Sequence, residues 1–269
     1  MATKFLTILA ALVALGFTPT LTAQHHHGHG VIPHYNVSAP FGDGAVRTFA
    51  TLTRPEGRGR RWPRPEQVGV EIPVAVMNSL PPTPLSVAID FPLKASGTPF
   101  QFMMLDWNPD GHAPAGIYDK PHFDFHFYLQ DYEDVMQIAA GPCSGVDCDV
   151  FEKATTPVPA KYLPPGFIDV GSVVPYMGNH LVDVTSPEFN GQPFTRTWIY
   201  GAYDGDVTFY EPMMTRQSLL DQPNQCSALK LPQAYAESGY YPTKVCTELD
   251  ARRSVYRVFV TGFVYRQQS

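Results

Sequence analysis

One short segment of the sequence spaces three metal-binding residue types two positions apart. Residues 121–128 read Pro-His-Phe-Asp-Phe-His-Phe-Tyr, so polar and aromatic residues alternate with period two. This alternation predicts a β-strand with one buried face. On such a strand His122, Asp124 and His126 share the face opposite the phenylalanines. Two imidazoles and a carboxylate on one rigid strand form half of a site for a divalent transition metal such as zinc, iron, manganese or copper.

The remaining ligands must come from elsewhere in the chain. His180 is the obvious third ligand, because most of the other histidines lie near the N-terminus. Glu211, in a second strand-like segment, is a plausible fourth. His122 and His126 would be about 13 Å apart at their Cα atoms on a straight strand, so both bind one ion only if the strand bends.

Two ligand arrangements fit these residues. In the favoured one, His122, His126, His180 and Glu211 surround the ion, and Asp124 orients an imidazole. This set resembles the three histidines and one glutamate of cupins, although cupins usually present His-x-His where this chain has His-x-x-x-His. In the second, His122, Asp124 and His180 form a two-histidine, one-carboxylate triad that resembles 2-oxoglutarate-dependent oxygenases. Arg196 lies rather far beyond His180 to anchor their co-substrate, so this arrangement ranks lower.

Three further residues are candidates for a pocket beside the ion. His112 lies in a turn-rich loop just before the strand and either lines the pocket or is an ordinary loop histidine, which its position favours. Tyr128 and Tyr176 could form walls. The alternative to any site is a solvated sheet face whose polar residues bind water.

A histidine-rich segment near the N-terminus contains a second group of potential metal ligands. Its histidines are His25, His26, His27 and His29. We interpret them as a low-affinity metal-collecting segment. Cleavage after Ala23 would make His26 the third residue, which permits a square-planar Cu(II) or Ni(II) site with the free amine. Cyclisation of Gln24 would remove that amine. The alternative is a disordered polar tail.

The first residues predict export. Lys4 precedes an apolar run, Phe5–Phe17, and a polar stretch ends at Ala23, as in a cleaved signal peptide spanning 1–23. We therefore expect a periplasmic or extracellular protein. Four cysteines fit an oxidising compartment. The simplest disulfides are Cys143–Cys148 and Cys226–Cys246, and the second should contribute about 3 kcal/mol. A zinc cluster is less consistent with the spacing, because neither pair is Cys-x-x-Cys.

Composition and net charge limit the kinds of binding partner that are expected. The chain of 269 residues has a net charge of −6 and no basic stripe, which disfavours nucleic acid and acidic membranes. No other apolar stretch is long enough to span a membrane. The partners expected are therefore a metal ion and a small-molecule ligand, while the aromatic content also fits a homo-oligomer. We expect a His-rich lead-in over 24–45 and a single β-rich domain over 46–269.

Short strand-like segments separated by turns predict an all-β fold, mostly antiparallel, either a β-sandwich or a cupin-like barrel with a few short helices. The expected strands are 47–53, 67–77, 85–91, 100–107, 122–128, 195–200, 206–212 and 255–266. Short helices are expected over 131–140 and 215–220. Asp-Gly at 204–205 supplies the turn of a hairpin.

Three regions of the sequence resemble a known protein family. They are 106–128, 176–183 and 198–214, and together they are similar to a family of exported bacterial proteins, with members in Thermus, that is classified only as a domain of unknown function. The resemblance covers most of the chain after the signal peptide. It implies that the shared residues belong together, but it implies no activity.

Three functions fit the sequence. The first is an exported metal-binding protein whose catalytic activity is undecided. The second is a metal-dependent, cupin-like enzyme, an oxygenase, isomerase or hydrolase, which needs an open coordination position facing a pocket. A metal-handling protein without activity would instead have a saturated site and no pocket. The third is a structural or assembly protein of the cell envelope.

Overall fold

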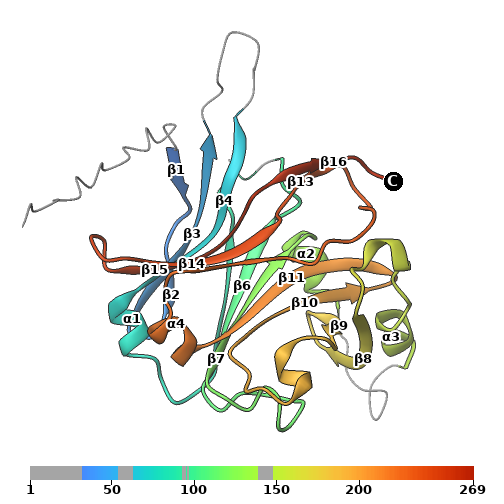
Figure 1. Ribbon diagram of the computed structural model, residues 1–269, viewed down its shortest axis with the longest axis horizontal. Coiled ribbons are helices and arrows are strands. Elements are labelled where there is room, and N and C mark those ends of the chain that lie inside the picture. The colour runs from blue at the N-terminus through green and yellow to red at the C-terminus, as the bar shows by residue number, and fades with distance from the viewer. Residues whose placement is uncertain (1–31, 54–62, 93–94, 96, 139–147) are drawn as a thin grey trace, which may run out of the picture.

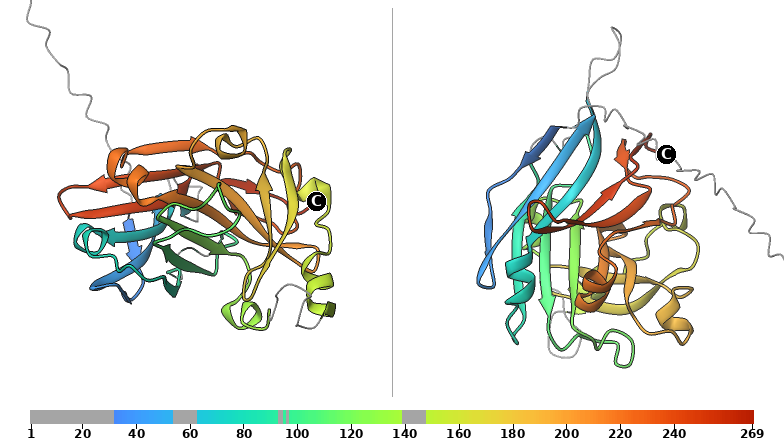
Figure 2. Two further views of the ribbon diagram at one scale, coloured as in Figure 1. Left: turned by 90° about the horizontal axis from the view of Figure 1, so that it is seen from below. Right: turned by 60° about the vertical axis from the view of Figure 1, so that its left-hand side comes forward.

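Two antiparallel sheets, each of seven strands, pack face to face in the computed structural model (Figures 1 and 2). The structure describes residues 32–53, 63–92, 95, 97–138 and 148–269. A further two-stranded sheet joins β13 (Gly239–Tyr241) to β16 (Val264–Arg266). The predicted all-β antiparallel fold is confirmed in its sandwich form. The cupin-like barrel is wrong, because the sheets do not close on themselves.

The first sheet has the strand order β1-β3-β4-β15-β14-β12, and β2 pairs with β3. Its strands are β1 (Ile32–Tyr35), β2 (Ala39–Phe41), β3 (Gly44–Thr53), β4 (Arg64–Pro73), β12 (Gln225–Ala228), β14 (Lys244–Asp250) and β15 (Val255–Thr261). β1 and β2 fall within the predicted lead-in, yet both pair with β3. The sheet therefore begins before residue 46.

The second sheet has the order β5-β6-β7-β11-β10-β9-β8. Its strands are β5 (Leu85–Asp90), β6 (Phe102–Asn108), β7 (His122–Tyr128), β8 (Phe167–Val174), β9 (Gly178–Asp183), β10 (Arg196–Tyr203) and β11 (Asp206–Thr215). The predicted hairpin is confirmed as β10 and β11, which turn at Asp204-Gly205, both with positive φ. β7 lies between β6 and β11, near the middle of the sheet.

The core lies between the two sheets and follows directly from the period-two pattern. Phe123, Phe125 and Phe127 of β7 are completely buried there. The first sheet contributes the alternating apolar residues of β4, including Val68 and Val70. Each buried side chain of this size stabilises the fold by roughly 1.5–3 kcal/mol. Because successive residues of a strand point to opposite faces, the polar residues of β7 lie on the outer face of the second sheet.

Helices are short. They are α1 (Val74–Asn78), α2 (Tyr132–Val135), α3 (Cys148–Ala154) and α4 (Arg216–Asp221), with 3-10 turns at Ala160–Tyr162 and Pro187–Asn190. Helices were expected over 131–140 and 215–220; α2 ends at Val135, so the first is shorter than predicted, and α4 matches the second. Thr215 caps α4 by accepting a hydrogen bond from the Ser218 amide.

Two predicted strands are too long. The strand expected over 67–77 ends at Pro73, which has no amide hydrogen to continue the ladder and precedes α1. The strand expected over 255–266 breaks at Gly262, whose φ is +69°. Its last residues form β16 in another sheet.

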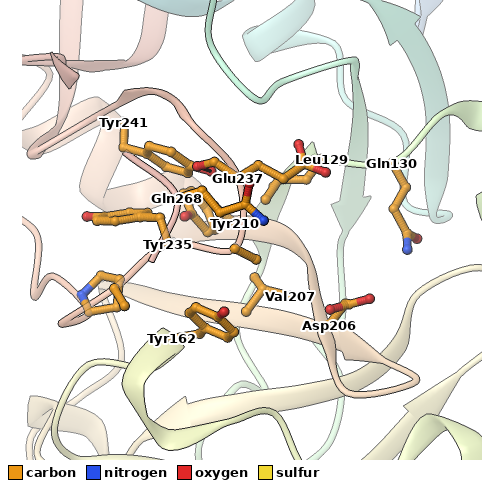
Figure 3. A pocket seen from close by; sticks show the side chains of 13 residues that line it. Leu129, Gln130, Tyr162, Asp206, Val207, Tyr210, Tyr235, Glu237, Tyr241 and Gln268 are labelled. Atoms are coloured by element: carbon orange, nitrogen blue, oxygen red, sulfur yellow. Dashed lines mark hydrogen bonds between the residues drawn. The ribbon is translucent and has the colours of Figure 1, made fainter. Parts of the chain in front are cut away.

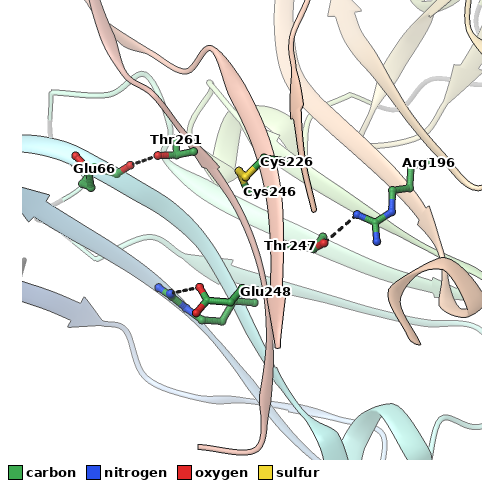
Figure 4. The surroundings of a disulfide bond; sticks show 8 residues. Glu66, Arg196, Cys226, Cys246, Thr247, Glu248 and Thr261 are labelled. Atoms are coloured by element: carbon green, nitrogen blue, oxygen red, sulfur yellow. Dashed lines mark hydrogen bonds and ion pairs between the residues drawn. A yellow bond between two sulfur atoms is a disulfide. The ribbon is translucent and has the colours of Figure 1, made fainter. Parts of the chain in front are cut away.

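A disulfide joins Cys226 of β12 to Cys246 of β14, as predicted (Figure 4). The two residues face each other directly in the ladder. Nearby, the Arg196 guanidinium donates a hydrogen bond of 2.9 Å to Thr247 Oγ1 and so ties β10 to the other sheet (Figure 4). This disulfide indicates a non-reducing compartment.

Several predictions fall outside the described residues. They concern the signal peptide, the histidines at 25–29 and Cys143, the predicted partner of Cys148. Within the described part of the chain, no helix is long and apolar enough to cross a membrane.

Candidate metal centre

The outer face of the second sheet carries acidic residues and histidines from neighbouring strands. Asp106 of β6 lies directly opposite Asp124 of β7. Across the next ladder, β11 contributes Glu211, and β9 contributes His180 from farther along the sheet. These residues line one cavity of about 430 Å³. The sheet therefore gathers side chains that are more than 100 positions apart in sequence.

His126, His180 and Glu211 form the inner group. The His126 Nε2 atom lies 3.4 Å from Glu211 Oε1, and the His180 Nε2 atom lies 4.0 Å from Glu211 Oε2. One ligand atom from each residue lies within 4.8 Å of the other two. Glu211 and His126 are almost fully buried. These distances would let one ion replace the direct contacts.

His112, His122 and Asp124 form the outer group, which meets the same distance limit. The His122 Nε2 atom lies 3.1 Å from Asp124 Oδ1, and the His112 Nε2 atom lies 3.3 Å from Asp124 Oδ2. His122 is completely buried, whereas the His112 side chain is 39% exposed. Each group thus offers two imidazoles and one carboxylate.

Backbone carbonyls orient three of the four histidines. The Nδ1 atoms of His112, His122 and His180 lie 2.6–2.8 Å from the carbonyl oxygens of Ala113, Lys120 and Ser172, respectively. Since a carbonyl only accepts, each Nδ1 must carry a proton, and the Nε2 atom of each ring is the one that points toward the carboxylates. This is the arrangement that fixes metal-binding histidines.

Asp106 and Asn108 of β6 support the two groups, and sequence reasoning missed both. The Nδ1 atom of His126 lies 3.1 Å from Asp106 Oδ2. The Asn108 side-chain amide donates a hydrogen bond of 2.7 Å to Asp124 Oδ2. An acidic residue inside the apolar run Phe-Met-Met-Leu-Asp-Trp was the available signal, because an unpaired carboxylate rarely occupies such a strand.

No Lys or Arg of the described chain compensates these carboxylates. Among the described residues, neither Lys nor Arg lines the cavity or pairs with Asp106, Asp124 or Glu211. Glu71 in the first sheet is equally buried, but Arg47, Arg253 and Arg257 all contact it. A buried charge without a counter-charge is costly, so the second sheet needs protons or a cation from solution.

Proton affinities in the metal-free site reflect this missing charge. Burial raises the pKa of Glu211 to about 8. Burial lowers the pKa of His126, but its contacts with Glu211 and Asp106 outweigh this effect and raise the value to about 9. Burial also disfavours protonated His112, yet its contact with Asp124 raises that pKa to about 9. At neutral pH, protons thus occupy places that a cation would take.

The pKa values of His180 and Asp124 are lowered, not raised. Burial lowers the pKa of His180 to about 4, so its ring is neutral and able to bind a metal. Burial by itself would raise the pKa of Asp124, but contacts with His112 and His122 lower it below the usual range. Asp124 therefore stays ionised.

A glycine in β10 lets an aromatic ring hold the inner group. Gly201 lies between His180 and Phe209 in the sheet. A Cβ atom at this position would come within 2.1 Å of the Phe209 ring. That ring packs against His126 and His180, with centroid distances of 4.9 and 5.5 Å. The absence of a side chain at Gly201 thus gives both imidazoles a fixed neighbour.

The loop that carries His112 also depends on a glycine. Gly111 has a φ of +72°, and a Cβ atom there would lie 2.2 Å from the Tyr118 carbonyl oxygen. The close approach allows the His112 amide to donate a hydrogen bond of 3.1 Å to that carbonyl. The loop is thereby closed over the outer group.

The rest of the cavity wall is mainly apolar. It includes Leu85, Pro114, Val170, Met177, Ile199 and Met213. His112 lines the cavity, as one interpretation of the sequence expected. Of the described lining residues, none is Tyr128 or Tyr176. Tyr128 is buried with its hydroxyl donating to the Tyr176 carbonyl, and the Tyr176 side chain is about half exposed.

The predicted four-ligand arrangement differs from the observed one. His126, His180 and Glu211 come together, but His122 belongs to the other group, because β7 stays extended and separates it from His126. The triad of His122, Asp124 and His180 is not formed either. Beside His122 and Asp124, the third residue is His112, where the triad arrangement expected His180. Metal binding by any of these residues stays a prediction.

Another cavity, of about 570 Å³, lies on the core side of β11, where Tyr210 points (Figure 3). Its walls include Tyr162, Tyr235, Tyr241 and Glu237. None of the described residues that line it is a histidine. It is therefore a less suitable place for a transition metal.

Comparisons of the chain with protein-family models, with curated proteins and with solved structures found no match in any of the three. The resemblance to the exported bacterial family therefore stays a prediction.

Proposed function

We propose that this protein binds a divalent transition metal through His126, His180 and Glu211 and presents it to a small molecule in the cavity. The observation that carries the proposal is the buried Glu211 carboxylate, which faces two imidazoles and no Lys or Arg in the described chain. A divalent cation would supply the missing positive charge and use both Nε2 lone pairs. Two nitrogen ligands and one oxygen ligand suit iron(II), zinc or manganese.

The cavity favours an enzyme over a metal store. Three protein ligands leave coordination positions open, as in catalytic rather than structural metal sites. The volume of about 430 Å³ lies in the range of small-molecule pockets. When bound, the metal would supply Lewis acidity and an activated water. His180 and His126 would be held in place by Ser172 and Asp106, and the apolar wall would orient a compact, largely apolar substrate.

The proposed location is the periplasm or the extracellular space. It is supported by the Cys226–Cys246 disulfide, which persists in oxidising compartments. The predicted signal peptide would direct the chain there.

Elemental analysis of untagged protein from its own host tests the metal site. We expect His180→Ala to lose one equivalent of metal, while His34→Ala, on the first sheet, retains the parent content. Thermal melting in excess EDTA would establish that His180→Ala still folds. A folded His180→Ala protein with the parent metal content would contradict the proposal.

A further inference from the structure

We infer that His112, His122 and Asp124 form a second metal position, so that the cavity holds two divalent cations rather than one. The inference deepens the proposed function, since both ions would face the same ligand. The outer position has its own ligands and can be tested whether or not the inner one is correct.

The first observation is a pair of buried atoms that lack hydrogen bonds. His122 Nε2 and Asp124 Oδ1 are both inaccessible; they contact each other without the geometry of a hydrogen bond, and neither has a hydrogen bond to any other described residue. They lie 3.1 Å apart. Buried polar groups without good hydrogen bonds are unfavourable. A cation bound to both atoms would remove this cost, whereas repacking of the surrounding apolar residues would not.

The second observation is the position of His112. Its ring lies with its centroid 4.7 Å from that of His122, and its Nε2 atom faces the other oxygen of Asp124. The His112 Nδ1 atom is held by the Ala113 carbonyl, 2.7 Å away. Here the loop closes over Asp124 and brings a third ligand.

The two positions open on the same space. The cavity is lined by His112 and Asp124 of the outer group and by His126, His180 and Glu211 of the inner group. Asp124 and His126 are two residues apart on β7, so the groups are adjacent on one face of one strand. Paired ions that share a substrate are usual in hydrolytic two-metal centres.

The two positions should differ in affinity. The His126 and Glu211 side chains of the inner group are 1% and 2% exposed, and every inner ligand comes from a strand. The outer group depends on His112, which is 39% exposed and lies on a loop. We therefore expect the inner ion to bind first and the outer ion to exchange faster.

Counting metal ions in matched variants tests the second position. All proteins carry alanine at the N-terminal histidines, which would otherwise bind metal themselves; these are His25, His26, His27 and His29. EDTA-treated protein is titrated with ZnCl2 by calorimetry and analysed for zinc after gel filtration. We expect two ions in this parent, one in His112→Ala, one in His180→Ala and none in the double variant. His34→Ala should keep two.

The outcomes separate the two proposals. One ion in the parent, lost in His180→Ala but kept in His112→Ala, overturns the second position and leaves the proposed function standing. One ion that is lost only in His112→Ala overturns the inner site instead. Loading with Mn²⁺ adds a test of proximity, because two ions in one cavity give a spin-coupled electron paramagnetic resonance spectrum. Two uncoupled Mn²⁺ signals would contradict the shared cavity.

Discussion

Replacing Glu211 by Gln should increase the free energy of unfolding of the metal-free protein. The same change should reduce the additional stability that bound metal provides. The side chain is buried, and burial raises its pKa from 4.5 to about 8. At low pH the carboxyl is protonated in both the folded and the unfolded protein, so its raised pKa does not destabilise the fold. Stability is then lost as pH rises from about 4.5 toward 8, because the unfolded chain releases the proton and the folded chain does not.

The magnitude follows from these values. At pH 7 the unfolded carboxyl is ionised, whereas folded Glu211 retains its proton. The interval from pH 4.5 to pH 7, at roughly 1.4 kcal/mol per unit, corresponds to a cost of about 3 kcal/mol. Glutamine has nearly the same shape and no proton to retain. Glu211→Gln should therefore gain about 3 kcal/mol over the parent at pH 7 and almost nothing at pH 4.5.

Urea unfolding in EDTA, followed by circular dichroism at both pH values, measures this difference. The matched control is Glu71→Gln, which alters an equally buried glutamate. Glu71 accepts hydrogen bonds from Arg47 and Arg253, so Glu71→Gln should lower the free energy of unfolding by about 2 kcal/mol or more. Excess zinc should stabilise the parent more than Glu211→Gln. A Glu211→Gln protein that is less stable than the parent at pH 7 without metal would contradict this prediction, because it would show that Glu211 has a stabilising partner in the metal-free fold.

Two other changes test the surroundings. Gly201→Ala would press on the Phe209 ring and should cost about 1–3 kcal/mol and weaken zinc binding at the inner group. Gly239→Ala is its control, since a Cβ there meets only ordinary contacts from 3.5 Å, and equal zinc affinity in the two variants would contradict the role of Phe209. Removing the disulfide by Cys226→Ala with Cys246→Ala should lower the free energy of unfolding by about 3 kcal/mol in urea, given a sequence separation of 20. An unchanged midpoint would show that the ladder alone holds β12 in place.

The strands that alternate cleanly could be predicted from the sequence. β7 is the best example, because three phenylalanines at period two define its buried face. β8 and β9 were missed, although β9 carries His180. β8 is mostly exposed and has a register shift between Asp169 and Ser172, so it lacks the apolar period by which strands are recognised.

The candidate ligands were found by residue type, but not their grouping. Grouping depends on which strands are neighbours, and local pattern does not determine that β6 and β11 flank β7. Strand geometry did indicate that His122 and His126 would be too far apart to share an ion on a straight strand. The position of His112 depends on the positive φ of Gly111 and the contacts of its loop, which spacing alone does not reveal.

The two buried glutamates show how differently the sheets of this molecule treat negative charge. Glu71 is matched by three guanidinium groups, those of Arg47 and Arg257 in neighbouring strands and that of Arg253 in the turn between β14 and β15, which is sufficient for stability. Glu211 is matched by imidazoles, and the Nδ1 atom of each already faces an acceptor, Asp106 or the Ser172 carbonyl. An arginine in their place would stabilise the fold but occupy the cavity permanently. Histidines leave the charge to be completed from solution, so the cost carried by the metal-free fold becomes binding energy for a cation.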